Sequence, residues 1–183
     1  MTPIVKKQLQ FICIMMFSAI LFLLVYTFLH EIGHGIIGML TGGTIDNITL
    51  GINAHISMHN TNYNNITLPL MNCFGMLFPY LICFIFVLFY NNKINNIYYH
   101  STHFLSLIMI MGSVFPWVFI PIISFFAQPP QKDDVTKFMM NSGFHPLVVS
   151  GISLLLILLL AFVALKKQAF QTYIIKSRAL SNQ

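Results

Sequence analysis

One short stretch of the sequence has residue types and spacing that predict metal chemistry. His30 and His34 are four residues apart and Glu31 lies between them, in the arrangement His-Glu-x-x-His. On a helix, residues four apart project from one face about one turn from each other, so two ring nitrogens can bind a single zinc ion. In zinc hydrolases with this arrangement, the carboxylate takes a proton from the water on the metal. We therefore expect one Zn²⁺ on His30 and His34, with Glu31 beside it.

Chance is a poor explanation for this pattern. The chain has seven histidines and a single glutamate, so the arrangement would arise at random in about one such sequence in a thousand. It also lies at the end of the apolar run 11–29, which is long enough to cross a bilayer. An ionisable residue inside a membrane helix costs roughly 2.5 to 3.5 kcal/mol on insertion scales, so three such groups need a partner such as a metal.

The composition predicts an integral membrane protein of one domain. Of the 183 residues, 57% are hydrophobic and only 7% are charged, which is outside the range of soluble globular domains. The net charge of +5 does not indicate nucleic-acid binding, because no basic run is interleaved with aromatic residues. The three cysteines all lie in apolar runs, and we interpret them as packing residues.

The apolar segments predict an all-α membrane protein with about four transmembrane helices and a small β-hairpin or edge strand near residues 44–60. We expect the helices at approximately 8–41, 66–90, 104–127 and 146–166, followed by a basic C-terminal tail at 167–183. In the third helix, Pro116 and Pro121 predict kinks or breaks. His100 and His103 are expected in the polar connection before this helix.

The first polar segment alternates apolar and polar residues from Ile48 to Met58, including Ile52 and Asn53, with the period of two that is typical of a half-buried strand. His55 and His59 would lie about 13 Å apart on such a strand, too far to share a metal. We therefore interpret them as histidines on its exposed polar face.

Four further residues in or near the apolar segments have two open interpretations each. Gly33, Gly35 and Gly38 follow the motif closely, and they serve either close helix packing or substrate access. Asn72 lies inside the second apolar segment, where an amide must face protein or water. It is either an interhelical hydrogen-bonding group or part of the site.

The second polar loop, 128–145, contains half of the acidic residues, Asp133 and Asp134. A hydrolytic zinc site needs a third protein ligand, and a carboxylate is a usual choice. From composition alone, the two aspartates are either ligand candidates or solvated loop acids.

The distribution of charge indicates whether that loop can reach the motif. Seven of the nine lysines and arginines fall on the termini and the Lys93 loop, so the positive-inside rule places both termini of a multi-pass cell-membrane protein in the cytoplasm. With four spans, the end of the first helix, the strand region and the acidic loop then share the opposite face, and the ligands can meet.

The motifs together resemble those of the site-2-protease-like intramembrane zinc metalloproteases. His30–His34 ends the first membrane helix and is followed by Thr41-Gly42-Gly43. The stretch Leu68–Gly75 is similar to that family's Gly-Pro-x-x-Asn segment. Asp134-Val135, followed by Ser142–Pro146, is similar to the late Asp motif of the family's small branch.

This resemblance implies a zinc metalloendopeptidase in which His30, His34 and a late aspartate hold Zn²⁺, with Glu31 as catalytic base and acid. We prefer Asp134 as the third ligand because it directly precedes a stretch that would restart a helix. Asn72 would bind the substrate or the oxyanion. The substrate would be a membrane-embedded protein or peptide in the lipid bilayer, unwound locally and held extended against the strand region as an added edge strand.

Two other classes of function use the same residues. A noncatalytic membrane zinc carrier or scaffold needs the histidines but not Glu31. A noncatalytic partner of an export or signalling complex would cut no substrate. A Glu31→Gln variant discriminates between these classes and a protease.

Overall fold

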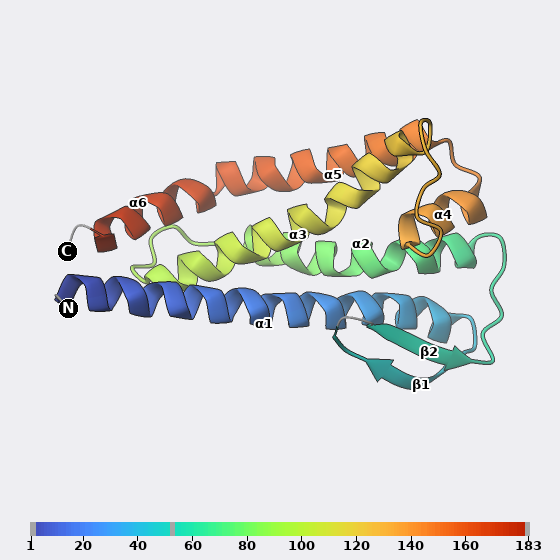
Figure 1. Ribbon diagram of the computed structural model, residues 1–183, viewed down its shortest axis with the longest axis horizontal. Helices are drawn as coiled ribbons and strands as arrows, with labels where there is room; N and C mark the ends of the chain where they lie inside the picture. Colours follow the sequence, from blue (N-terminus) through green and yellow to red (C-terminus); the bar gives the residue numbers. More distant parts are fainter. Residues whose placement is uncertain (1–2, 52–53, 182–183) are drawn as a thin grey trace.

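The computed structural model describes residues 3–51 and 54–181 (Figure 1). Its elements are α1 (Pro3–Leu40), β1 (Thr44–Thr49), β2 (His55–His59), α2 (Thr67–Leu88), α3 (Ile97–Ile123), α4 (Asp134–Ser142), α5 (Pro146–Lys166) and α6 (Ala169–Ser181). Within the described ranges, four helices, α1, α2, α3 and α5, are long and apolar enough to cross a membrane. The predicted fold class, a helical membrane protein with a small hairpin, is confirmed.

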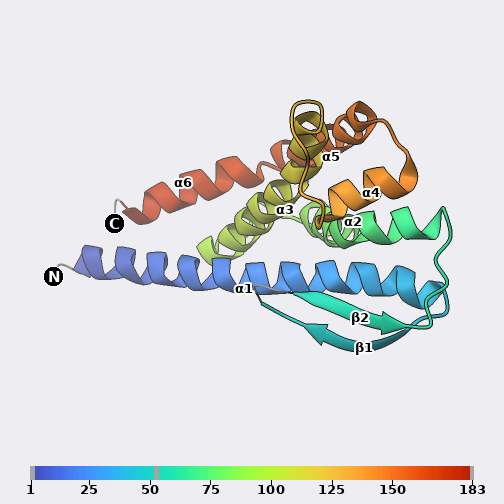
Figure 2. The same cartoon turned by 45° about the vertical axis from the view of Figure 1, so that its right-hand side comes forward.

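The long helices form an elongated bundle whose core lies between α2, α3 and α5. Tyr80, Leu107, Trp117 and Leu160 are among its buried side chains. Within this core, the Tyr80 hydroxyl donates a hydrogen bond to the carbonyl of Leu156 across the helix interface. Both termini lie at one end of the bundle, whereas α4 and the hairpin lie at the other end, along the C-terminal half of α1 (Figures 1 and 2).

Glycines set how closely the neighbours of α1 approach it. A Cβ on Gly33 would overlap the backbone of α2 next to Gly75, so the two helix backbones are in direct contact. A Cβ on Gly35 or Gly38 would overlap side chains of β2. All three glycines near the motif therefore serve packing, which was one of the two open interpretations.

The polar segment after α1 is a hairpin of two short antiparallel strands, with Ile48 opposite Ile56. The alternating pattern therefore does not form one continuous strand from Ile48 to Met58. The chain turns around Gly51, whose φ of +117° suits glycine. Ile52 and Asn53, which belong to the same pattern, lie outside the described residues.

The two histidines of β2 are exposed, as the sequence predicts. The His59 imidazole contacts the Asp46 carboxylate and the Thr44 hydroxyl. His55 and His59 therefore belong to the surface of the hairpin.

The prediction that His100 and His103 are loop residues is wrong. The third helix begins at Ile97, seven residues before the predicted start, because the Asn96 side chain accepts hydrogen bonds from two backbone N–H groups of its first turn. Both histidines are buried. His100 bonds to the Tyr90 hydroxyl at 2.6 Å, and the His103 ring stacks on Phe86 with a centroid distance of 3.8 Å. Aromatic packing and a helix cap therefore extend the helix past the apolar run.

Other boundaries also differ from prediction: α1 begins at Pro3, five residues before the expected start, and α4 lies within the expected polar loop 128–145. α3 continues through Pro116 and Pro121 to Ile123 without a break. A membrane helix tolerates proline, because neighbouring groups satisfy the freed carbonyls. The expected tail after residue 166 forms α6 in its described part, after Gln168 turns the chain with a φ of +60°.

Candidate metal centre and its cavity

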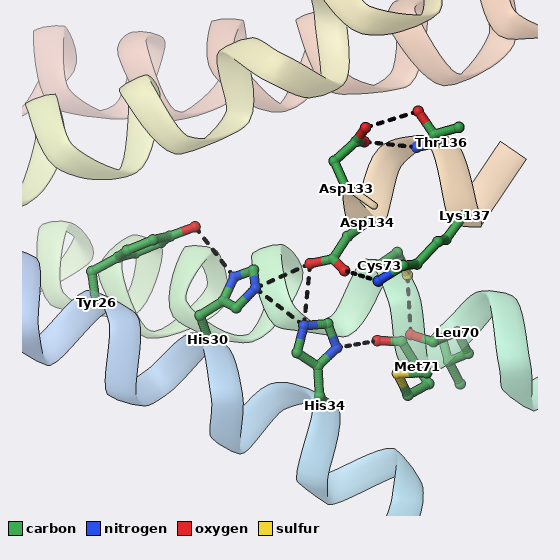
Figure 3. Close-up of polar contacts among 10 residues, drawn as sticks. All are labelled: Tyr26, His30, His34, Leu70, Met71, Cys73, Asp133, Asp134, Thr136 and Lys137. Carbon is green, nitrogen blue, oxygen red and sulfur yellow. Dashed lines mark hydrogen bonds and ion pairs between the residues drawn. The ribbon is translucent and has the colours of Figure 1, made fainter. Parts of the chain in front are cut away.

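Three side chains from two helices converge at the hairpin end of the bundle (Figure 3). The Nε2 atoms of His30 and His34, on consecutive turns of α1, are 3.1 Å apart. The Oδ2 atom of Asp134, at the start of α4, lies 3.1 Å from the first and 3.2 Å from the second. Neighbouring ligand atoms of a tetrahedral zinc ion are about 3.3 Å apart for bonds of about 2.0 Å. The three atoms therefore fit one zinc-sized ion, with a fourth position open.

The two adjacent aspartates have different roles in α4. Asp133 is the N-cap, and its Oδ1 and Oδ2 atoms accept hydrogen bonds from the backbone N–H and the hydroxyl of Thr136 at 2.8 and 2.9 Å. Asp134 is the first helical residue and points at the histidines. Of the two candidates for a third ligand, only Asp134 joins the group that can hold a metal.

Outer contacts orient both imidazoles. The Nδ1–H of His34 donates to the carbonyl of Met71 on α2 at 2.8 Å, which leaves the Nε2 lone pair for a metal. The Nδ1 atom of His30 lies 3.4 Å from the Tyr26 hydroxyl, one turn earlier on α1. Sequence reasoning missed both partners. Met71 acts through its backbone and leaves no side-chain signal, whereas the four-residue spacing of Tyr26 from His30 could have revealed it.

Gly75 of α2 provides the space that the imidazoles occupy. A Cβ at this position would lie 2.6 Å from Cε1 of His34 and 2.9 Å from Cε1 of His30. Such distances are far below van der Waals contact. The same glycine that allows α1 and α2 to touch therefore also allows the two rings to stand between the helices.

The environment of Asp134 favours the ionised form that a ligand needs. Burial acts to raise the pKa of its carboxyl, but the hydrogen bonds and charges of the His30 and His34 imidazoles, in their protonated form, outweigh burial and hold the pKa well below its ordinary value. The Nζ atom of Lys137 lies 3.9 Å from Oδ1 of Asp134, at the limit of an ion pair. The carboxylate is therefore available to a metal at neutral pH.

A cavity of about 700 Å³ opens in front of the three side chains. Glu31 lines it and is only 6% exposed. The other lining residues come from the hairpin and the segment after it, from α2, and from α4 with the residues before it: Ala54, His55, Ile56, Met58, Thr61, Tyr63, Leu68, Met71, Asn72, Lys132, Asp133, Lys137 and Asn141. Glu31 and the metal group, which consists of His30, His34 and Asp134, thus line one cavity.

Asn72 is buried at the edge of this cavity. The residue is only 2% exposed, and its Nδ2 atom has no hydrogen-bond partner among the described residues. A buried amide donor without a partner is costly unless something else binds it. Of its two open interpretations, this favours a place in the site over an interhelical hydrogen bond.

The three cysteines do not belong to the metal group. Cys13, Cys73 and Cys83 are free thiols.

The chain matches no family model, and neither a curated protein nor a solved structure is significantly similar to it.

Proposed function

We propose that this chain is an intramembrane zinc metalloprotease that hydrolyses a peptide bond in or near the membrane segment of a protein or peptide. The observation that carries the proposal is the convergence of His30, His34 and Asp134 beside Glu31 in one cavity of an apolar helix bundle. Two histidines and a carboxylate with an open fourth position are a donor set typical of hydrolytic zinc sites.

Each residue of the site has a task in this chemistry. A zinc ion on His30, His34 and Asp134 would supply a Lewis acid for a peptide carbonyl and a water molecule. Glu31 accepts the proton of the attacking water and returns it to the leaving amine. The unpartnered amide of Asn72 is a donor for the substrate carbonyl as it gains negative charge.

The hairpin offers a means of holding the substrate extended. His55, Ile56 and Met58 of β2 all line the cavity, although successive side chains of a strand point to opposite faces. The cavity therefore borders the edge of β2 rather than one of its faces. We infer that a substrate segment, once unwound, pairs with this edge and presents its backbone to Glu31.

The position of the site along α1 suits water access. His30 and His34 are ten and six residues before the end of α1, or about 15 and 9 Å along its axis. In a four-span protein with both termini in the cytoplasm, the cavity would lie just below the opposite lipid surface. There, water reaches the site while a membrane segment of the substrate can approach from the bilayer.

The proposal is tested with Glu31→Gln in protein reconstituted into liposomes with single-span peptides. The wild type is expected to hold about one zinc and to cut a peptide. The variant should keep its zinc and lose cleavage by at least about a hundredfold, because only the proton acceptor is removed. Asp46→Asn, at the one acidic residue outside the cavity, is the matched control and should behave as wild type.

Two results would contradict this proposal. If Glu31→Gln fully replaces the wild type in the cell and neither protein cuts a peptide, the histidines belong to a noncatalytic zinc scaffold or to a partner of a larger complex. A wild type without bound metal would remove the hydrolytic site altogether.

A further inference from the structure

The cations of the chain are unevenly distributed over the molecule. Seven of the nine lysines and arginines lie on the two terminal helical regions and the loop before α3. This loop contacts α6 and the residue before it, since Lys176 of α6 donates to Asn95 and Asn92 donates to Gln168. The other two, Lys132 and Lys137, are at the opposite end of the bundle, and both line the cavity of the metal centre. Two isolated cations at a site suggest a role in recognition.

The charges of the cavity favour an anionic ligand once a divalent ion is bound. Besides the two lysines, the charged lining residues are Glu31, Asp133 and Asp134. A divalent cation would turn the net charge of this set from one negative to one positive. The Asp133 carboxylate is already engaged by two hydrogen bonds from Thr136. The lysines therefore face a cavity whose net charge would be positive with the ion bound.

Lys137 is only loosely bound within the protein. Its Nζ atom is 3.9 Å from the Asp134 carboxylate, at the limit of an ion pair, and its side chain is 47% exposed. Such a pair contributes little to stability. Lys132 lies in the exposed turn just before α4. Both side chains are thus free to reach a ligand in the cavity.

We propose that Lys132 and Lys137 form a carboxylate-binding subsite that selects substrates with a carboxylate close to the scissile bond. This inference rests on the proposed protease function. A carboxylate on Lys137 would lie within about 7 Å of Asp134, which is about two residues of extended peptide at about 3.4 Å each. The carboxylate can come from an acidic side chain or from a free C-terminus, and the subsite recognises the chemistry that they share.

The test uses pairs of single-span peptides in liposomes with wild-type protein. The two peptides of one pair differ at a single position, the second residue on the C-terminal side of the cleaved bond, which is Glu in one peptide and Gln in the other. A second pair ends at that point with a free or an amidated C-terminus. We expect kcat/KM to be about fivefold higher for the peptide with a carboxylate, as for one or two exposed ion pairs. The preferred pair identifies the source of the carboxylate, and high salt should reduce the preference.

A double variant, Lys132→Gln with Lys137→Gln, should cut both members of a pair at the rate of the uncharged peptide and keep its zinc. The matched control is Lys166→Gln with Lys167→Gln at the far end of the bundle, which should retain the preference. Equal wild-type rates on charged and uncharged peptides would overturn the subsite and leave the protease standing. Absence of cleavage in every peptide, with wild type and Glu31→Gln alike, would overturn the protease proposal and the subsite with it.

Discussion

Neighbouring residues of one type have separate tasks in this site, and Asp133 and Asp134 are the clearest example. Asp133 uses both carboxylate oxygens to start α4, and Asp134, one position later, turns toward His30 and His34. The N-cap residue has extended backbone and the next residue has helical backbone. Their side chains therefore leave the chain in different directions.

This division predicts different consequences for the two amide variants. Asp133→Asn keeps a good N-cap, so we expect it to retain about one zinc per chain. Asp134→Asn removes a charged ligand and should bind little zinc. Metal analysis of the purified proteins measures both. Asp133→Ala should keep the metal site but lower the stability of the protein by about 1 kcal/mol through loss of the cap.

The reverse pattern, with zinc lost in Asp133→Asn and kept in Asp134→Asn, would show that Asp133 is the ligand and would contradict the role given to Asp134. Thermal unfolding in detergent checks that each variant is folded, so that loss of zinc is not confused with loss of structure.

At the scale of elements, the crossing of α1 and α2 forms the site. Gly33 brings the two backbones into contact, and Gly75 leaves room for both imidazoles. The carbonyl of Met71, one turn before Gly75, then orients His34. A single close contact between two helices therefore sets the position of both rings.

Gly75→Ala is accordingly expected to impair metal binding. The new methyl group would collide with both imidazoles, and neither ring can move away without leaving its partner in the metal group. We expect zinc affinity to fall by about ten- to a hundredfold, as when the contacts that orient a ligand are lost. A competition titration with a chelator measures this change.

Gly112→Ala and Gly151→Ala are matched controls on α3 and α5, where a Cβ would meet open space. Both should bind zinc as wild type does, and each should stabilise its helix by up to about 1 kcal/mol. If Gly75→Ala binds zinc as tightly as these controls, the rings have more freedom than the contact at Gly75 implies.

The hairpin is a second element with a testable role. A proline at Ser57, in the middle of β2, removes a backbone N–H and disturbs strand pairing. The metal group comes from α1 and α4 alone, so Ser57→Pro should keep its zinc and lose most of its cleavage. Ser57→Ala retains the backbone N–H and should remain active. Normal cleavage by the proline variant would exclude capture of the substrate along β2.

At the scale of the whole molecule, the sequence predicted the elements whose signals are local. The apolar runs gave the long helices, and Thr41-Gly42-Gly43 marked the end of α1, where Gly42 has a φ of +88°. The four-residue spacing of His30 and His34 was sufficient to place two rings together. Such features depend on helix geometry alone, so they can be read from the order of residues.

Features that depend on contacts between distant segments could not be predicted in this way. The start of α3 depends on the Asn96 cap and on packing of His103 against Phe86. The orienting carbonyl of Met71 and the space at Gly75 exist only because α2 lies against α1. The sequence left a hairpin and a single edge strand open for residues 44–60, because both strands of the hairpin share one pattern of polarity.

The distribution of charge over the whole bundle leads to the last prediction. Both termini and the loop with Lys93 lie at one end, and Gln131 precedes α4 at the other. If the basic end faces the cytoplasm, the two ends lie on opposite sides of the membrane. In a variant whose three native cysteines are replaced by alanine, Gln131→Cys should then react with a membrane-impermeant maleimide in intact cells. Lys93→Cys should react only after permeabilisation. The opposite pattern would mean that the protein has the inverted orientation in the membrane. Labelling of both cysteines from one side would mean that the bundle does not span the membrane.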